Sequence, residues 1–204
     1  MKILTVPSGL LKATMHIVYD ESHTAIVIDP IDHTTLVHAL LTTSLSLKAI
    51  FLTHAHFDHA TDLVRIQNHF LVPSFIHQSG QESLNDPQKN VSALIGSELF
   101  LGKCSNTLSD GDILSFGELT VFVHHTPGHS KDSVCYEIGN ALFTGDTLFS
   151  GGIGRCDLYG ANVNDMRTSL KKLVNLSKDY TVYPGHGPST TLEREKRLNP
   201  YLAL

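Results

Sequence analysis

The residues with the clearest capacity for chemistry lie between positions 53 and 59, where four possible metal ligands fall within six positions. They are His54, His56, Asp58 and His59. Imidazole nitrogens and carboxylate oxygens are ligands that zinc and iron use in proteins. In an extended segment alternate side chains point to the same side, so His54 and His56 can converge on one ion. Packing alone does not explain this density of ligands, which predicts a metal site.

Three further ligand-type residues each follow a turn that contains glycine. They are His129 after Thr126-Pro127-Gly128, Asp146 after Thr144-Gly145, and His186 after Tyr183-Pro184-Gly185. Glycine lets the backbone adopt conformations and close approaches that a Cβ atom would forbid, so several loops can converge on a small volume. Taken singly, each segment could be an ordinary turn. Together with the histidine-rich segment they predict one centre with many ligands.

The elements that must position these ligands can be read from the spacing of apolar residues. Short apolar runs predict strands at 15–19, 25–28, 48–52, 72–76, 113–116, 119–124, 133–138, 141–144 and 181–183. Helical spacing predicts helices over 33–45, 60–70, 164–176 and 192–198. The segment 81–104 is less periodic, which is typical of a surface excursion beside an active site. Two β-rich halves with helices and no linker predict one α/β domain over 1–204, built as a four-layer sandwich.

Composition and charge restrict the partners. Hydrophobic residues make up 41% and charged residues 17% of the chain, which are values of globular proteins. A net charge of −5 argues against nucleic-acid binding. The N-terminus lacks the uninterrupted apolar run of a secretory signal, and three cysteines without a C-x-x-C pair argue against a disulfide framework. We expect a cytoplasmic protein with no membrane or nucleic-acid partner, and the sequence gives no indication of its oligomeric state.

The ligands in their order and spacing resemble those of the metallo-β-lactamase superfamily, and within it the short glyoxalase II-like (hydroxyacylglutathione hydrolase-like) hydrolases. The resemblance covers nearly the whole chain and implies the metallo-β-lactamase fold, a four-layer αβ/βα sandwich. It also implies two ions, one held by His54, His56 and His129 and the other by Asp58, His59 and His186. Asp146 would bridge them, because its charge offsets the repulsion between two dications. Spacing alone would place Asp58 beside His54 and His56.

The implied chemistry is hydrolysis. Zinc is the expected metal, with iron or manganese as alternatives, because sites made of His and Asp accept all three. Two ions would lower the pKa of a water between them and yield a bridging hydroxide that attacks a polarised carbonyl. Asp58 is the candidate catalytic residue that orients this water or accepts its proton. Since a thiol leaves readily as a thiolate, we predict an enzyme that hydrolyses a small-molecule thioester such as S-lactoylglutathione.

Residues in the C-terminal half of the sequence indicate how the protein could recognise its substrate. The resemblance places Arg155 where relatives carry a basic residue near the thiol carrier, and guanidinium can bind a carboxylate through two hydrogen bonds. Cys156 stands where relatives usually carry Thr or Ser, and no base motif accompanies it as a nucleophile would require. The chain ends soon after His186. We therefore expect a single domain without the C-terminal helical domain of full-length glyoxalase II, and looser selectivity for the substrate.

Two other functions are compatible with parts of the pattern. Persulfide dioxygenases share the fold but use one iron ion held by two His and one Asp, so the ligand motif alone allows a mononuclear iron oxidoreductase. The sequence Pro184-Gly185-His186-Gly187 favours a hydrolase over that alternative. A binding module without metal is disfavoured, because every ligand position is filled.

Overall fold

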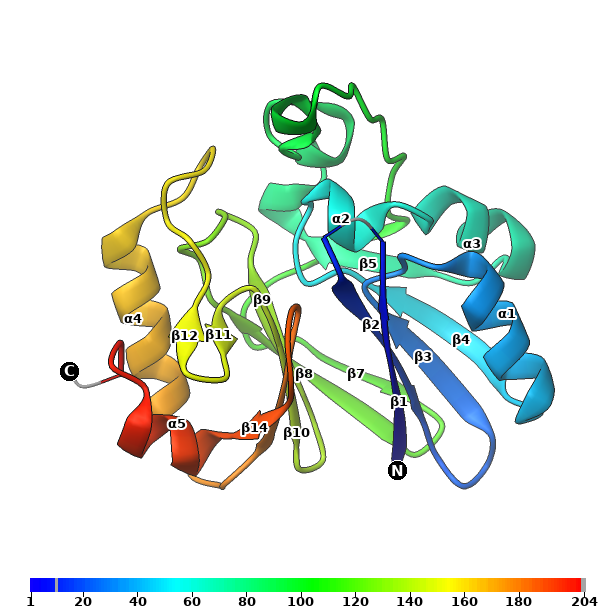
Figure 1. The fold of residues 1–204 in the computed structure, drawn as a ribbon. Coiled ribbons are helices and arrows are strands. Elements are labelled where there is room, and N and C mark those ends of the chain that lie inside the picture. Colours follow the sequence, from blue (N-terminus) through cyan, green and yellow to red (C-terminus); the bar gives the residue numbers. More distant parts are fainter. Residues whose placement is uncertain (10, 203–204) are drawn as a thin grey trace.

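The computed structural model describes residues 1–9 and 11–202, which form both strands and helices (Figure 1). The first half contains β1 (Lys2–Ser8), β2 (Ala13–Tyr19), β3 (Thr24–Ile28), α1 (His33–Thr42), β4 (Ser46–Phe51), α2 (Phe57–Ala60), α3 (Leu63–Phe70), β5 (Ser74–His77) and β6 (Asn106–Leu108). Between β5 and β6 lie three short 3-10 helices, η1 (Gln78–Gly80), η2 (Ser83–Asn85) and η3 (Ser92–Ile95).

The second half contains a meander of strands and then two helices with two further strands between them. Its elements are β7 (Ile113–Phe116), β8 (Leu119–His125), β9 (Val134–Ile138), β10 (Ala141–Gly145), β11 (Leu148–Phe149), β12 (Gly152–Ile153), α4 (Val163–Val174), β13 (Thr181–Pro184), β14 (Thr190–Thr191) and α5 (Leu192–Leu198). Within residues 1–9 and 11–202, none of the helices is both long and apolar enough to cross a membrane.

Two six-stranded sheets organise the molecule. The first has the order β1-β2-β3-β4-β5-β6, antiparallel from β1 to β3 and parallel from β3 to β6. The second has the order β14-β13-β10-β9-β8-β7, with an antiparallel meander from β7 to β10 and a parallel pairing of β10 with β13. The βαβ step and the meander that the sequence predicts are confirmed.

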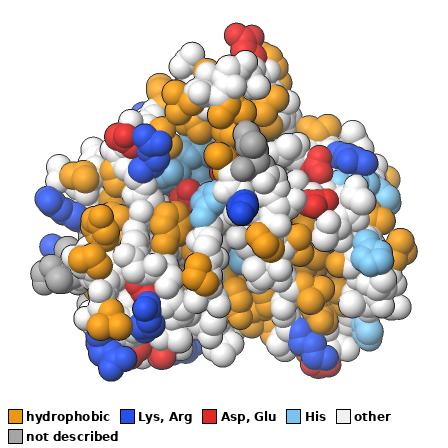
Figure 2. Space-filling view, viewed as in Figure 1, with side chains coloured by type: hydrophobic (Ala, Val, Ile, Leu, Met, Phe, Trp, Pro, Cys, Tyr) orange, Lys and Arg blue, Asp and Glu red, His pale blue; other side chains and the backbone are white. Residues whose placement is uncertain are grey.

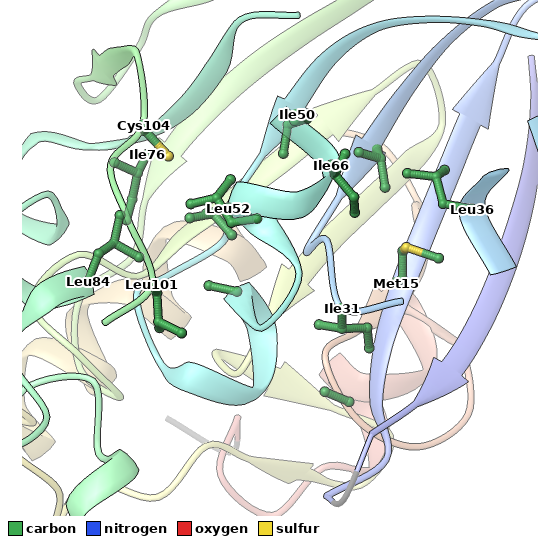
Figure 3. Packing of buried hydrophobic residues seen from close by; sticks show 14 of the residues in the cluster. Met15, Ile31, Leu36, Ile50, Leu52, Ile66, Ile76, Leu84, Leu101 and Cys104 are labelled. Atoms are coloured by element: carbon green, nitrogen blue, oxygen red, sulfur yellow. The ribbon is translucent and has the colours of Figure 1, made fainter. Parts of the chain in front are cut away.

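Three hydrophobic cores lie between four layers. Successive side chains of β3 point alternately into two of these cores. Ala25 and Val27 join the core that includes Leu36 of α1 and Ile66 of α3 (Figure 3). Their neighbours in sequence, the isoleucines of β3, point the other way into the core between the two sheets. A third core packs α4 and α5 against the outer face of the second sheet. The four-layer αβ/βα sandwich is therefore confirmed.

The predicted ligands lie at strand ends that meet along one edge of the sandwich. His54 and His56 follow β4, His129 follows β8, Asp146 follows β10 and His186 follows β13. An isolated bridge between Ala13 of β2 and His186 links the two sheets at this edge. The fold thus brings segments more than 100 residues apart in sequence to one place.

Candidate metal centre

The histidine-rich segment changes conformation in its middle, and this change sorts its ligands into two sets. His56 is extended, with φ −63° and ψ 144°, and caps the helix α2 that begins at Phe57. His54 and His56 therefore lie on the extended part, whereas Asp58 and His59 lie on the first turn of the helix. The expectation from spacing alone, that Asp58 points beside His54 and His56, is wrong because the segment does not stay extended.

Seven side chains from four loops gather at this edge. Among the residues that the structure describes, donor atoms converge within 4.8 Å in three groups, namely His54, His56 and His129; Asp58, His59 and His186; and His54, His59 and Asp146. The first two groups have the membership that the family resemblance implies. That they bind metal ions stays a prediction, but the structure brings together every residue that this prediction names.

Asp146 lies between the two sets of histidines. Its Oδ2 atom is 3.4 Å from Nε2 of His129 and 3.6 Å from Nε2 of His186, which belong to different sets. Its Oδ1 atom is 3.5 Å from Nε2 of His59. A single carboxylate can therefore reach both sets, as a bridging ligand must.

Hydrogen bonds behind the centre fix the tautomer of His54. The Thr53 hydroxyl lies 2.8 Å from Oδ2 of Asp29 and donates its proton there, because a carboxylate only accepts. Nδ1 of His54 lies 3.0 Å from the same hydroxyl oxygen and therefore donates to it. This arrangement leaves the lone pair of His54 Nε2 free for a ligand.

Two more histidines are oriented in the same way. Nδ1 of His59 donates to Oδ2 of Asp29 at 2.8 Å, and Nδ1 of His129 donates to the backbone carbonyl of Arg155 at 2.9 Å. Each ring therefore presents Nε2 to the centre. Partners of this kind set the tautomer of metal-binding histidines and raise their basicity.

Unsatisfied buried atoms test whether a metal suits this site. Nε2 of His54 and Oδ1 of Asp146 are buried without a hydrogen-bond partner among the described residues, and Nδ1 of His56 faces Nε2 of His129 at 2.9 Å. Buried polar atoms without partners are rare, since each costs the free energy of its desolvation. Nitrogen and oxygen donors that face one another without protons to share are the ligand set that a divalent ion completes. The residues present therefore fit two divalent ions.

The electrostatics of the centre depend on its burial. Burial and the neighbouring imidazoles hold the pKa of His54 and of His56 well below the usual value, so both rings are neutral. Burial alone would lower the pKa of His59 as well, but the carboxylates of Asp58, Asp29 and Asp146 raise it to about 10. Without metal, His59 is therefore protonated at neutral pH.

This protonation predicts how metal binding depends on pH. An incoming ion must displace the proton on Nε2 of His59, because Nδ1 donates to Asp29. We expect zinc binding at pH 8 to release at least about one proton per chain, with an affinity that falls about tenfold per pH unit as the pH is lowered from 9 to 7. Calorimetry in buffers of different ionisation enthalpy measures the protons. An affinity that does not change over this range would contradict the prediction.

Gly185 illustrates why glycine accompanies the ligands. A Cβ atom at this position would lie 2.4 Å from Oδ1 of Asp146 and 2.7 Å from Cε1 of His59. Gly185→Ala should therefore displace the carboxylate between the two sets and weaken zinc binding at least about tenfold. Gly152→Ala is the matched control, because its Cβ would meet only Cβ of Phe149 at 4.0 Å. Competition with a chelating dye measures both affinities, and equal values would rule out this role for Gly185.

A cleft of about 290 Å³ opens onto the centre. Figure 2 shows a hollow in this face with histidine and acidic side chains inside it and hydrophobic side chains above it. Arg155 lines the cleft, but its guanidinium forms two hydrogen bonds with Asp157, at 2.6 and 2.8 Å. Cys156 belongs to none of the three ligand groups, and burial beside Asp157 raises its pKa, so it is a thiol and not a reactive thiolate.

Two buried aspartates that support the centre, Asp29 and Asp132, were not expected from the sequence, and the buried His16 lies beside the centre as well. Asp29 accepts from Thr53 and His59, as described above, and the backbone N–H of Ala55 donates to Asp132 at 2.8 Å. His16 is 2% exposed, and its Nε2 lies 3.3 Å from the carbonyl of Pro184. Asp29 directly follows β3, which lies next to β4, the strand that precedes His54. This position was the one indication in the sequence that Asp29 lies near the centre.

Comparison with known sequences gives a consistent set of relatives. The model of the metallo-beta-lactamase superfamily matches residues 13–186. An uncharacterized protein of Mycobacterium leprae is 34% identical and covers 99% of both chains. The probable metallo-hydrolase YqgX of Bacillus subtilis is 39% identical over 76% of this chain and 75% of its own. A hydroxyacylglutathione hydrolase of Tolumonas auensis is 37% identical over 81% of this chain, which is 58% of that protein.

Solved structures agree with these relatives. The crystal structure of BLEG-1 B3 metallo-beta-lactamase has a TM-score of 0.94 and 32% identity over the full length of both chains. The protein TTHA1623 in a di-iron-bound form has a TM-score of 0.86 and 34% identity, and covers 98% of this chain and 100% of its own. ETHE1 from Myxococcus xanthus has a TM-score of 0.83 and 26% identity, with 100% of this chain and 85% of its own covered.

Proposed function

Because this chain belongs to the metallo-beta-lactamase superfamily, we propose that it is a hydrolase that uses two divalent ions, zinc being the expected metal, to cleave small-molecule thioesters. The observation that carries this proposal is the convergence of seven ligand side chains with Asp146 between the two sets. The 37% identity to a hydroxyacylglutathione hydrolase supports the thioester class and makes S-lactoylglutathione the first substrate to test.

The side chains of the cleft provide what a hydrolysis needs beyond the metals. Bound divalent ions would lower the pKa of a water and polarise the substrate carbonyl. The pKa of Asp58 lies well below its usual value, since His59 and His186 outweigh the effect of its burial. Asp58 therefore stays ionised and can orient the attacking water by accepting a hydrogen bond from it. A thiolate leaves without a general acid, so no further proton donor is required.

Arg155 remains a proposed contact for the thiol portion of the substrate. Because Asp157 already holds the exposed guanidinium, its effect should be modest. We expect Arg155→Ala to raise KM for a glutathione thioester about three- to tenfold, as for an exposed ion pair worth about 1 kcal/mol, and to spare a small thioester without carboxylates on its thiol. Steady-state kinetics on the two substrates would disprove a recognition role if both KM values changed equally.

A second candidate is a mononuclear iron oxidoreductase of the persulfide dioxygenase type, because the ligand motif alone allows it. Release of thiol from S-lactoylglutathione under anaerobic and aerobic conditions separates the two candidates. A hydrolase keeps the same rate without oxygen, whereas a dioxygenase consumes oxygen with glutathione persulfide and leaves the thioester intact. A cephalosporin is the control substrate, because of the similarity to BLEG-1 B3 metallo-beta-lactamase. Oxygen uptake without thioester cleavage would overturn the hydrolase proposal.

A further inference from the structure

The cleft above the centre has an apolar wall that the proposed reaction does not itself require. Besides the ligand residues and Arg155, its lining consists of Leu11, Phe57, Val91, Leu94, Ile95 and Leu158. Leu94 is 69% exposed and Ile95 is 43% exposed, although both are large aliphatic side chains. Apolar side chains that stay exposed beside a polar centre commonly mark a binding surface for an apolar ligand.

A second cavity continues this wall away from the metal centre. It measures about 170 Å³ and is lined by Gly9, Ile31, Phe57, Asp58, Thr61, Ile95 and Leu99. Phe57, Asp58 and Ile95 line both cavities. Asp58 is the one ionisable residue of the second cavity among the residues described. The second cavity therefore adjoins the cleft at these three residues, and we call it, together with the shared wall at Ile95, the apolar groove.

Hydrogen bonds hold the segment 81–104, which carries Leu94 and Ile95, in place. Asn90 is fully buried, and its side-chain amide donates to the carbonyls of Leu84 and Leu99. The carbonyl of Asn90 accepts from the backbone N–H of Phe57 at 3.0 Å, which ties the excursion to α2. Leu84 and Leu101 also enter the core beneath the first sheet (Figure 3).

The backbone of Val91 is strained. Its φ is +59°, a conformation that is strained for a β-branched residue and that persists only where the surroundings impose it. The strained residue directly precedes η3, which carries Leu94 and Ile95, and itself lines the cleft. The apolar wall is therefore preformed over the metal centre.

The lining of the cleft has a charged part and an apolar part, and this difference can orient a substrate. Arg155, which is paired with Asp157, lines the cleft, and Ile95 lines both the cleft and the second cavity. When a thioester is cleaved, the leaving thiolate carries the negative charge and is disfavoured in an apolar groove. The alkyl chain of the acyl group stays uncharged throughout, because the oxyanion forms at the carbonyl carbon, and the chain gains free energy from burial in the groove.

We propose that the groove along Ile95 binds the acyl chain of the substrate, so that the preferred substrates are thioesters of apolar acids with about four to eight carbons. This inference rests on the proposed hydrolase function and narrows its substrate class. It differs from recognition of a short polar acyl group such as lactoyl, which would leave the apolar wall uncovered.

A series of acetyl, butyryl, hexanoyl and octanoyl thioesters of one small neutral thiol tests the proposal. Each methylene that enters the groove should raise kcat/KM about three- to fourfold, which gives a hexanoyl-to-acetyl ratio on the order of 10². Ile95→Ser and Leu94→Ser, measured separately so that one folding failure is not decisive, should each lower this ratio at least about tenfold. Leu41→Ser, at a residue 75% exposed on α1, is the control that should keep the ratio.

The outcomes distinguish this inference from the proposed function. Cleavage of all four thioesters with equal kcat/KM, or a ratio that both variants leave unchanged, overturns the acyl groove and leaves the hydrolase proposal standing. If no thioester is cleaved, the hydrolase proposal fails. Calorimetry then measures the binding of hexanoate and of acetate, and the comparison tests whether the groove binds an acyl chain. Tighter binding of hexanoate that Ile95→Ser abolishes supports it, and equal binding of the two acids overturns it.

Discussion

Asp146→Asn should release both metal ions and lower kcat/KM by at least about 10³-fold, because removing even one electrostatic contact of a transition state costs 10²–10³. Oδ2 of Asp146 lies within 3.6 Å of a histidine from each set, so this carboxylate reaches both. Asparagine has nearly the same shape but offers one oxygen and no charge. Two nearby dications would then repel each other without compensation. Metal content after dialysis and steady-state kinetics measure the two effects.

A control variant separates the loss of a ligand from a general change in charge. Asp165→Asn removes an exposed acidic group in the first turn of α4 and should retain two ions and the full rate. If Asp146→Asn also retained both ions after dialysis, the bridging role would be wrong. If it kept one ion and lost all activity, the second ion alone would depend on the bridge.

The parts of this molecule that the sequence predicts are those set by local pattern. A continuous apolar run from Ala25 to Ile28 places β3 correctly, because both faces of that strand meet a core. The strands that escaped prediction lack this signal. β6 has only three residues, and β11 and β12, which pair with each other, have two each, so these strands are too short to show an apolar period. β1 lies at the edge of its sheet and is half exposed, without a regular apolar face.

Residue type and spacing identify the seven candidate ligands but not their arrangement. Their division into two sets was implied by the family resemblance, and in the structure it follows from the helix that begins at Phe57. Aspartate and histidine have low helix propensity, and four residues are too few to show a helical period. Asp29 could not be assigned either, since its role depends on contacts with residues 24 and 30 positions later. The sequence shows it only as a turn residue before Pro30.

Asp58→Asn should separate water activation from metal binding. The pKa of Asp58 lies well below its usual value, because His59 and His186 oppose the effect of burial, so the native side chain is a carboxylate at every pH at which the protein is assayed. Such a weak base serves better to orient a water than to remove its proton. We expect kcat to fall about 10²-fold at saturating zinc, at the low end for proton-transfer groups, while KM changes less than threefold.

The zinc concentration decides how this result is interpreted, because Oδ2 of Asp58 also lies 3.4 Å from Nε2 of His186 and belongs to the second set of ligands. The kinetics must therefore be measured across a zinc titration, with Asp165→Asn as the control for charge. A kcat that returns to the native value at high zinc would mean that Asp58 only holds the ion. A kcat that stays low with two ions bound, at an unchanged KM, assigns Asp58 to the positioning of the attacking water.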